Sequence, residues 1–205
     1  MTIYIDLDGT IYKTHELYNR FIKLFDKYNL TETAIQNFMK QEPYKTHKSF
    51  DILANKIIHD YNLNTEEVEN ELNKIYTKDL VYPDVIPFLE KYSKKYNLIL
   101  LTLGNTEHQK RKINSSNLNQ YFQDIIITNK DKSKLNIDYS NGIFIDNNPK
   151  ELEKFYHANA KHLIRIIRDA DNTYKNLKNI INTKEYSNFE QISNYIDKIG
   201  GIYNE

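Results

Sequence analysis

Short runs of apolar residues, each bounded by polar or turn-forming residues, recur along the chain. Within each run Ile, Leu and Phe follow one another almost without interruption instead of alternating with polar residues. This pattern is typical of parallel strands that helices cover on both faces of a sheet. We therefore expect buried strands at Ile3–Leu7, Leu98–Leu103, Ile125–Thr128, Ile143–Asp146 and Leu163–Ile167.

Helical patterns separate the later strands. Val85–Tyr96 follows Pro83 and Asp84, which favour a helix start. Thr106–Asn117 and Pro149–Asn159 fit the crossover helices that connect parallel strands. The alternation of strand and helix predicts an α/β fold whose core is a doubly wound, Rossmann-like parallel sheet.

The segment between the first two predicted strands has a different pattern. It contains no convincing strand, and its apolar residues recur at helical spacing, as at Leu17 and Phe21. We expect a helical domain inserted into the sheet domain. Residues 1–12 and 83–205 would then form the α/β core, and residues 13–82 the helical insert.

The chain after Arg168 is polar, and we expect irregular structure there up to a terminal helix near Asn188–Ile199. No apolar run approaches the length of about 18 residues that a membrane-spanning helix needs. No basic segment of the kind that opens a signal peptide precedes the first strand. We therefore expect a cytoplasmic protein without a membrane partner.

Composition and charge reduce the number of functional classes that fit this chain. Among the 205 residues, 28 basic ones balance 28 acidic ones, so no overall field favours nucleic acid as a partner. Three consecutive basic residues, Lys110, Arg111 and Lys112, are interpreted as the solvated face of a helix. The chain has no cysteine, which excludes disulfides and thiolate metal sites, and its histidines show no metal-binding spacing.

The first strand runs into two aspartates, Asp6 and Asp8, which are followed by Gly9. Strand side chains alternate between two faces, so both carboxylates are expected to point the same way, and Gly9 permits a sharp turn. Open α/β sheets place their active sites at this end of the strands. One carboxylate could attack a substrate while the other transfers protons, and a divalent cation could hold both. An ordinary polar turn is the alternative.

Other strand ends bring polar groups to the same edge. The second strand ends in Thr102 and Leu103, just before a helix. The Thr102 hydroxyl and the backbone amides there could bind an anion, or the segment could be a plain turn. The fourth strand ends in Asp146 and Asn147. The side-chain oxygens of these residues could bind Mg²⁺, or the residues could form an ordinary turn before a helix. The loop after the third strand carries lysines that could neutralise phosphate or be solvated: Lys130, Lys132 and Lys134.

The order of these features resembles that of the haloacid dehalogenase (HAD) superfamily, whose four signature motifs occur in this order on such a core. The stretch from Asp6 to Thr10 is the most specific match, Thr102 and Asp146 are good matches, and the lysine motif is the loosest. The resemblance covers essentially the whole chain. The helical insert resembles the C1-type cap of the superfamily.

The resemblance implies a role for each matching residue. Asp6 would be the nucleophile that attacks phosphorus and becomes an aspartyl phosphate, and Asp8 would be the general acid and base. Dehalogenases of the superfamily typically lack an acid at the second position, so Asp8 favours phosphoryl transfer. Thr102 and the backbone amide of Leu103 would bind the phosphoryl group.

The resemblance also implies Mg²⁺ as the cofactor. Asn147 stands where many members carry a second acid, which would lower metal affinity, and the motif lysine lacks its usual following proline. Lys132 is the expected motif lysine, with Lys130 as the nearest alternative, and it would offset repulsion between nucleophile and substrate. The implied metal ligands are Asp6, Asp8 through its backbone carbonyl, Asp146 and Asn147.

Together these features predict a Mg²⁺-dependent phosphatase that hydrolyses a small phosphomonoester, with a small phosphorylated metabolite as its partner. A phosphomutase that uses the same intermediate and a catalytically silent binding module on the same fold are the alternatives. Residues of the insert would select the substrate. The candidates for the cleft wall are Tyr12, His15, Arg20, Tyr44, Lys45 and His47.

Overall fold

The computed structural model of the chain describes residues 1–169, 173–178, 181 and 183–202. Its centre is a six-stranded sheet in the order β3-β2-β1-β4-β5-β6, and all neighbouring strands run parallel. The predicted α/β class is therefore confirmed. The strands are β1 (Thr2–Ile5), β2 (Asn97–Leu103), β3 (Asp124–Thr128), β4 (Gly142–Asp146), β5 (His162–Ile166) and β6 (Lys184–Tyr186).

Alternating side chains of the central strands separate two hydrophobic layers. Ile3 and Ile5 of β1 belong to one layer and Tyr4 to the other. Ile143 and Phe144 of β4 divide in the same way. Tyr4 and Phe144 stack across the two strands with ring centroids 4.7 Å apart. Both faces of the sheet are thus apolar, which is why these strands appear as continuous apolar runs in the sequence.

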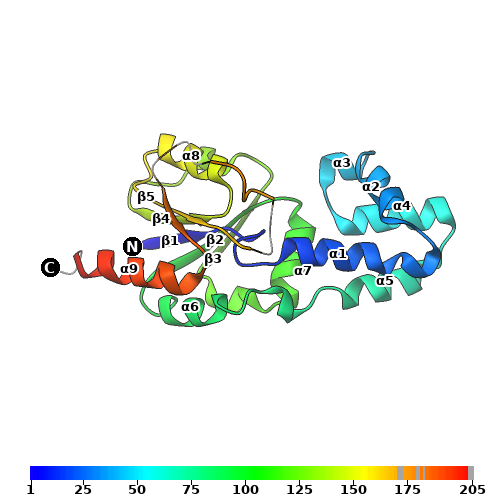
Figure 1. Ribbon diagram of the computed structural model, residues 1–205, viewed down its shortest axis with the longest axis horizontal. Helices are drawn as coiled ribbons and strands as arrows, with labels where there is room; N and C mark the ends of the chain where they lie inside the picture. Colours follow the sequence, from blue (N-terminus) through cyan, green and yellow to red (C-terminus); the bar gives the residue numbers. More distant parts are fainter. Residues whose placement is uncertain (170–172, 179–180, 182, 203–205) are drawn as a thin grey trace.

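Helices cover both layers (Figure 1), with α8 on one side of the sheet, α6 and α9 on the other, and α7 between the sheet and the helical insert. The predicted starts of α6, α7 and α8 are confirmed, and these three helices end earlier than predicted. Asn105 and Asn148 cap α7 and α8 with their side chains. None of the helices in the described residues is long and apolar enough to cross a membrane. The bounds are α6 (Val85–Tyr92), α7 (Thr106–Ser115), α8 (Pro149–His157) and α9 (Phe189–Ile202).

Strand β6 is missing from the sequence prediction, which expects irregular structure in this part of the chain. It is short, it lies at the edge of the sheet beside β5, and its first two residues are exposed. An edge strand of this kind needs no apolar run, because it is not covered on both faces. It pairs with β5 through Ile164 and Lys184, Arg165 and Glu185, and Ile166 and Tyr186.

The segment of residues 13–82, between β1 and α6, is helical, as predicted, and its helices lie together beyond the carboxyl end of the sheet (Figure 1). Thr31 and Asn64 cap two of them with their side chains. The division into a core of residues 1–12 and 83–205 and a cap of residues 13–82 stays a prediction. The helices of the insert are α1 (Thr14–Leu24), α2 (Glu32–Met39), α3 (Tyr44–His47), α4 (Phe50–Tyr61) and α5 (Thr65–Lys74).

Two short connections join the helical insert to the sheet, and they lie side by side. The backbone N–H of Lys13 donates to the carbonyl of Leu80 at 2.7 Å, and that of Tyr82 donates to the carbonyl of Ile11 at 3.1 Å. Buried apolar residues of the sheet and of the insert belong to one continuous cluster. The insert is therefore packed against the edge of the sheet where the predicted functional residues lie.

Candidate active site

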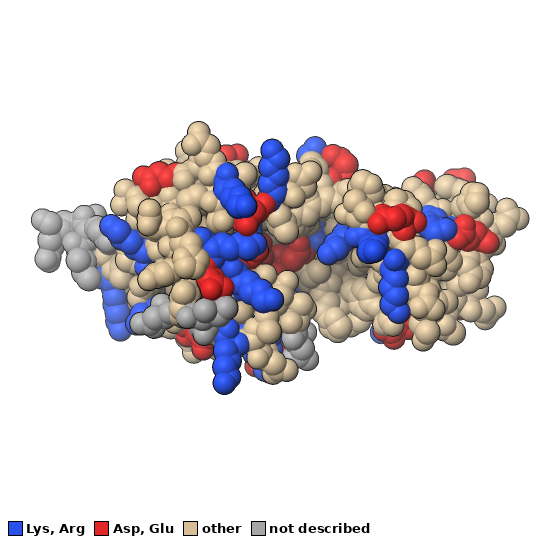
Figure 2. Space-filling view, turned by 90° about the horizontal axis from the view of Figure 1, so that it is seen from above, with Lys and Arg blue, Asp and Glu red and all other residues tan. Residues whose placement is uncertain are grey.

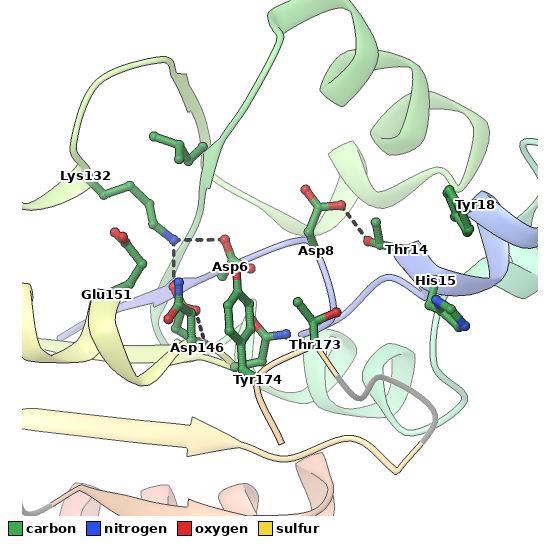
Figure 3. Close-up of a pocket in the computed structure, with 13 residues that line it drawn as sticks. Asp6, Asp8, Thr14, His15, Tyr18, Lys132, Asp146, Glu151, Thr173 and Tyr174 are labelled. Atoms are coloured by element: carbon green, nitrogen blue, oxygen red, sulfur yellow. Dashed lines mark hydrogen bonds and ion pairs between the residues drawn. The ribbon is translucent and has the colours of Figure 1, made fainter. Parts of the chain in front are cut away.

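A cavity of about 470 Å³ opens at the carboxyl ends of β1, β2 and β4, where parallel α/β sheets place their sites. Figure 2 shows a hollow between the two parts of the molecule, with acidic side chains in it and basic side chains on both sides. Figure 3 gives the arrangement inside. The wall consists of Asp6, Asp8, Thr14, His15, Tyr18, Leu103, Lys132, Asp146, Asn147, Asn148, Glu151, Thr173 and Tyr174.

Lys132 connects two carboxylates at the carboxyl ends of different strands, Asp6 directly after β1 and Asp146 as the last residue of β4. Its Nζ donates to Oδ1 of Asp6 at 2.9 Å and to Oδ2 of Asp146 at 2.6 Å (Figure 3). Lys132 begins a short 3-10 turn after β3, and the Tyr139 hydroxyl donates to its backbone carbonyl at 2.5 Å. All three charged side chains are nearly buried. Water therefore screens these ion pairs far less than it would at the surface.

Two carboxylates, Asp6 and Asp146, share the single ammonium group of Lys132. Burial raises the pKa of Asp6 to about 7, against the opposing charge of Lys132. The neighbouring carboxylates of Asp146 and Asp8 add to the rise. Burial by itself would lower the pKa of Lys132, but the carboxylates of Asp146 and Asp6 raise it above its ordinary value. Lys132 thus stays protonated, while full ionisation of Asp6 at neutral pH requires further positive charge nearby.

The carboxylate of Asp8 is held by three donors. Its Oδ1 accepts from Thr14 Oγ1 and from Lys112 Nζ, both at 2.6 Å, and its Oδ2 accepts from Gln109 Nε2 at 2.7 Å. Burial would raise the pKa of Asp8, but the charge of Lys112 and these hydrogen bonds lower it to about 2. In this arrangement Asp8 is ionised at neutral pH.

The two aspartates line one cavity but have different partners. The predicted strand Ile3–Leu7 is too long, since β1 ends at Ile5. Gly9 then turns the chain with φ 71°, in the left-handed region that favours glycine. Because the regular alternation of the strand stops before both aspartates, it does not direct them the same way. Asp6 contacts Lys132, whereas Asp8 turns toward Thr14 (Figure 3).

Two residues of α7 at this site, Gln109 and Lys112, are missing from the sequence prediction. The interpretation of Lys112 as part of a solvated face with Lys110 and Arg111 is wrong, because Lys112 is only 3% exposed. The sequence does contain a signal for this. Ile113 is the one aliphatic residue between Thr106 and Ser115, so a helix packed at this place must bury polar side chains. The polar residues that it buries are His108, Gln109 and Lys112.

The residues predicted to bind phosphate are placed in different surroundings. Leu103 lines the cavity at the end of β2. Thr102 is fully buried behind it, and its Oγ1 accepts a hydrogen bond from Gln109 Nε2 at 2.9 Å. Lys130 is exposed on the loop after β3. Lys132 is one of the described residues of the cavity wall, whereas Thr102 and Lys130 are not.

Asp146 and Asn147 extend the wall at the end of β4, and the backbone N–H of Asn147 donates to Thr10 Oγ1 at 3.0 Å. With Asp6 and the backbone carbonyl of Asp8, they are the predicted magnesium ligands. The described residues contain no group of three or more His, Cys, Asp or Glu side chains that could hold a metal. Amide, carbonyl, water and phosphate oxygens would have to complete the set, which is how Mg²⁺ is commonly bound.

Two further parts of the chain contribute to the wall. His15 and Tyr18 project from α1 of the insert, and Thr173 and Tyr174 come from the segment after β5 (Figure 3). Of the residues considered for the cleft wall, His15 lines the cavity, whereas Tyr12 is fully buried. The described wall does not include the remaining candidates, Arg20, Tyr44, Lys45 and His47.

A family model described as haloacid dehalogenase-like hydrolase matches residues 1–163 of the chain. The parallel sheet and the acidic site at its carboxyl edge thus define a hydrolase of this class. The chain belongs to the haloacid dehalogenase-like hydrolases. No curated protein matches it in sequence.

Solved structures of this family share the fold of the whole chain. A candidate haloacid dehalogenase-like hydrolase from Burkholderia xenovorans is 12% identical with a TM-score of 0.72, covering 96% of this chain and 97% of that one. A candidate β-phosphoglucomutase from Thermotoga maritima is 13% identical with a TM-score of 0.67, covering 97% and 99%. The candidate HAD-hydrolase YfnB from Bacillus subtilis, bound to magnesium, is 14% identical with a TM-score of 0.61, covering 95% and 97%.

Proposed function

We propose that this protein is a Mg²⁺-dependent phosphatase that hydrolyses a small phosphomonoester through an aspartyl phosphate on Asp6. The observation that carries the proposal is the position of Lys132 Nζ between Asp6 and Asp146, in the wall of a cavity that Asp8 also lines. A buried lysine beside a carboxylate nucleophile offsets the repulsion that an anionic substrate would meet. The cavity volume of about 470 Å³ suits a small ester.

In the first step a carboxylate oxygen of Asp6 attacks phosphorus, and the bond between phosphorus and the ester oxygen breaks. The departing oxygen takes a proton from Asp8, so Asp8 must be protonated and directed at the ester at that stage. In the structure Thr14, Gln109 and Lys112 hold Asp8 as a carboxylate. We therefore interpret this arrangement as the resting state.

In the second step a water molecule gives a proton to Asp8 and attacks the phosphorus of the aspartyl phosphate. The bond from phosphorus to the Asp6 oxygen breaks, and inorganic phosphate leaves. Asp6 ends as a carboxylate and Asp8 ends protonated, as both were at the start of the first step. Asp8 takes up this proton from solvent when it leaves the resting state and returns it to solvent on going back, so the cycle is balanced. Lys132 stays protonated throughout and offsets the charge on the phosphoryl oxygens.

The residues of the site fit Mg²⁺. Asp6, Asp146, Asn147 and the backbone carbonyl of Asp8 would hold it, and the bound ion would supply the positive charge that stabilises the transferred phosphoryl group. Burial, together with the carboxylates of Asp146 and Asp8, raises the pKa of Asp6 to about 7, and a divalent cation beside Asp6 would favour its ionised form. The magnesium-bound structure from Bacillus subtilis supports this choice of ion.

A phosphomutase is the second candidate, supported by the similarity to the candidate β-phosphoglucomutase. It would use the same aspartyl phosphate but return the phosphoryl group to a second position of the substrate instead of to water. Carbon–halogen cleavage is a weaker candidate, because it gives no role in leaving-group protonation to Asp8. The three activities differ in their products: inorganic phosphate, an isomeric phosphoester, or halide.

The test measures these products with p-nitrophenyl phosphate, nucleotides, sugar phosphates and haloacids in the presence of Mg²⁺. Release of inorganic phosphate is expected, and Asp6→Asn should lower kcat by at least about 1,000-fold. Asp124→Asn is the matched control, since Asp124 is exposed at the start of β3, away from the site. If the wild type and Asp6→Asn are equally inactive on every ester, the phosphatase proposal fails and a binding module remains.

A further inference from the structure

Helix α7 carries two pairs of residues with different partners. Gln109 and Lys112 contact Asp8, whereas His108 and Arg111 contact the helical insert. The members of each pair are three positions apart, so each pair lies along one face of the helix. The two faces are adjacent, and one rigid element therefore touches both the insert and the expected general acid.

The contacts on the Asp8 side are buried. Lys112 is 3% exposed and Gln109 is 1% exposed. An ammonium group that is removed from water needs a partner of opposite charge, and Asp8 is the carboxylate that Lys112 contacts at 2.6 Å. The amide nitrogen of Gln109 would lie 2.9 Å from a Cβ at Gly104. The absence of a side chain at Gly104 thus leaves room for Gln109 to reach Asp8.

The contacts on the insert side join α7 to two other helices. The Arg111 guanidinium pairs with Asp51 of α4 and with Asn73 of α5. It also lies 4.4 Å from the ring centroid of Tyr76, which follows α5. The Tyr76 hydroxyl is 3.2 Å from Nδ1 of His108. These contacts hold α7 to the insert at several points.

The insert also reaches Asp8 directly. Thr14 is the first residue of α1, and its hydroxyl donates to Oδ1 of Asp8 at 2.6 Å, the same oxygen that accepts from Lys112. The donors around Asp8 thus come from two elements, α1 of the insert and α7. Any displacement of the insert relative to the sheet would change the spacing of these donors.

We propose that Lys112 and Gln109 are positioning residues for Asp8 and that α7 couples their hold on it to the position of the insert. In the present position the donors keep the Asp8 carboxylate turned away from an ester at Asp6. Movement of the insert shifts α1 and α7 and releases the carboxylate toward the substrate. The effect on catalysis rests on the proposed function, whereas the coupling itself does not.

The catalytic part of the proposal is tested with two leaving groups. p-Nitrophenolate departs without a proton, whereas an alkoxide needs one from the general acid. Lys112→Met removes one of the donors that keep Asp8 away from the ester, so it should raise kcat for an alkyl phosphomonoester relative to kcat for p-nitrophenyl phosphate by at least about tenfold. Arg111→Met should change the same ratio in the same direction by a smaller factor, although Arg111 does not line the cavity.

Lys110→Met is the matched control, because Lys110 is exposed on the same helix and pairs with Glu107. Its ratio of activities on the two esters should equal that of the wild type. A loss of the same factor on both esters in Lys112→Met would indicate a structural role only and would overturn the positioning role. Gln109→Leu removes a different donor and decides the question if Lys112→Met does not fold.

The coupling is tested without any activity measurement. Because the chain has no cysteine, spin labels can be attached to Lys45→Cys on α3 and Tyr156→Cys on α8, two exposed positions. Electron–electron double resonance then gives the distribution of distances between the insert and the sheet. Lys112→Met should broaden or shift this distribution, and Lys110→Met should leave it unchanged.

The two measurements separate the two proposals. An unchanged distance distribution in Lys112→Met overturns the coupling, even if the protein hydrolyses esters. A wild type that hydrolyses no ester overturns the proposed function, and the distance distribution then still decides whether α7 couples the insert to Asp8.

Discussion

Lys132 Nζ lies 2.6 Å from Oδ2 of Asp146, and both side chains are almost fully buried. The contact joins the turn after β3 to the end of β4, across the carboxyl edge of the sheet. The same ammonium group contacts Asp6 after β1 at 2.9 Å. A single side chain therefore holds together the acidic groups on which the proposed chemistry depends.

Removal of this ammonium group should destabilise the protein as well as inactivate it. Lys132→Met leaves two buried carboxylates without their cation, and we expect it to lower the free energy of unfolding by about 3–5 kcal/mol. Denaturation with urea at pH 7 measures the change. Lys130→Met, on the exposed part of the same loop, should change it by less than about 0.5 kcal/mol. Equal losses in the two variants would contradict the distinct role of Lys132.

Mg²⁺ should stabilise the folded protein through Asp146. At a concentration about 100 times its Kd, the ion adds about 2.7 kcal/mol to the free energy of unfolding, because it binds only the folded state. We expect a higher Tm with Mg²⁺ than with EDTA for the wild type and no such difference for Asp146→Asn. Asp138→Asn, a change at an exposed loop position, should keep the difference. Wild-type Tm values that are the same with Mg²⁺ and EDTA would argue against the metal site.

The buried His108 should make stability depend on pH. Burial lowers the pKa of His108 to about 3, and the nearby charge of Lys112 adds to the effect. In the unfolded chain the pKa of histidine is about 6.5, so the unfolded state binds more protons between these two values. The contribution of His108 to the free energy of unfolding should therefore fall as the pH decreases below about 6.5, by up to about 1.4 kcal/mol per pH unit.

Urea denaturation at a series of pH values from about 7 to 5 measures this dependence. An unfolded histidine titrates in about this range. His108→Gln should reduce the slope of unfolding free energy against pH in that range. His157→Gln is the control, because His157 is exposed at the end of α8, and it should keep the wild-type slope. A wild-type slope in His108→Gln would contradict the neutral, buried state of His108.

Replacement of Arg168, even by lysine, should lower the stability of the folded protein. Its Nε donates to the carbonyl of Thr10 at 3.1 Å, and its Nη1 donates to Oδ2 of Asp84 at 2.7 Å. A lysine ammonium group lacks the planar geometry that makes both contacts at once. We expect Arg168→Lys to lower the free energy of unfolding by about 2–3 kcal/mol. Lys175→Met, which breaks an exposed pair with Asp169, should cost less than about 0.5 kcal/mol.

Much of the fold could be predicted because its elements are local. Strands β1 to β5 are continuous apolar runs, since a strand covered on both faces has no solvent-facing positions. The helices begin at residues whose side chains cap them, such as Asn105 and Asn148. Strand β6 could not be predicted, because its pairing with β5 at the sheet edge depends on no apolar pattern of its own.

The candidate site, like the fold, could be predicted only in part. Asp6 and Asp146 lie at the carboxyl ends of strands, at the edge where parallel sheets place their chemistry, so their nearness was predictable from topology. The partners of Asp8 were not predictable. Lys112 is 104 positions from Asp8 in the sequence, and the charges around it in α7 suggest a solvated surface. Its burial follows from the way in which α7 packs between the sheet and the insert.

The sequence by itself determined the order of strands and helices and the acidic character of one sheet edge, because periodicity and residue type are local properties. Only the tertiary structure decided which lysine meets which aspartate. Lys112 and Lys132 are buried beside carboxylates, whereas Lys110 and Lys130, two positions before each, remain exposed. The physical reason is that the pairing of distant charges depends on the packing of whole elements, which no local pattern records.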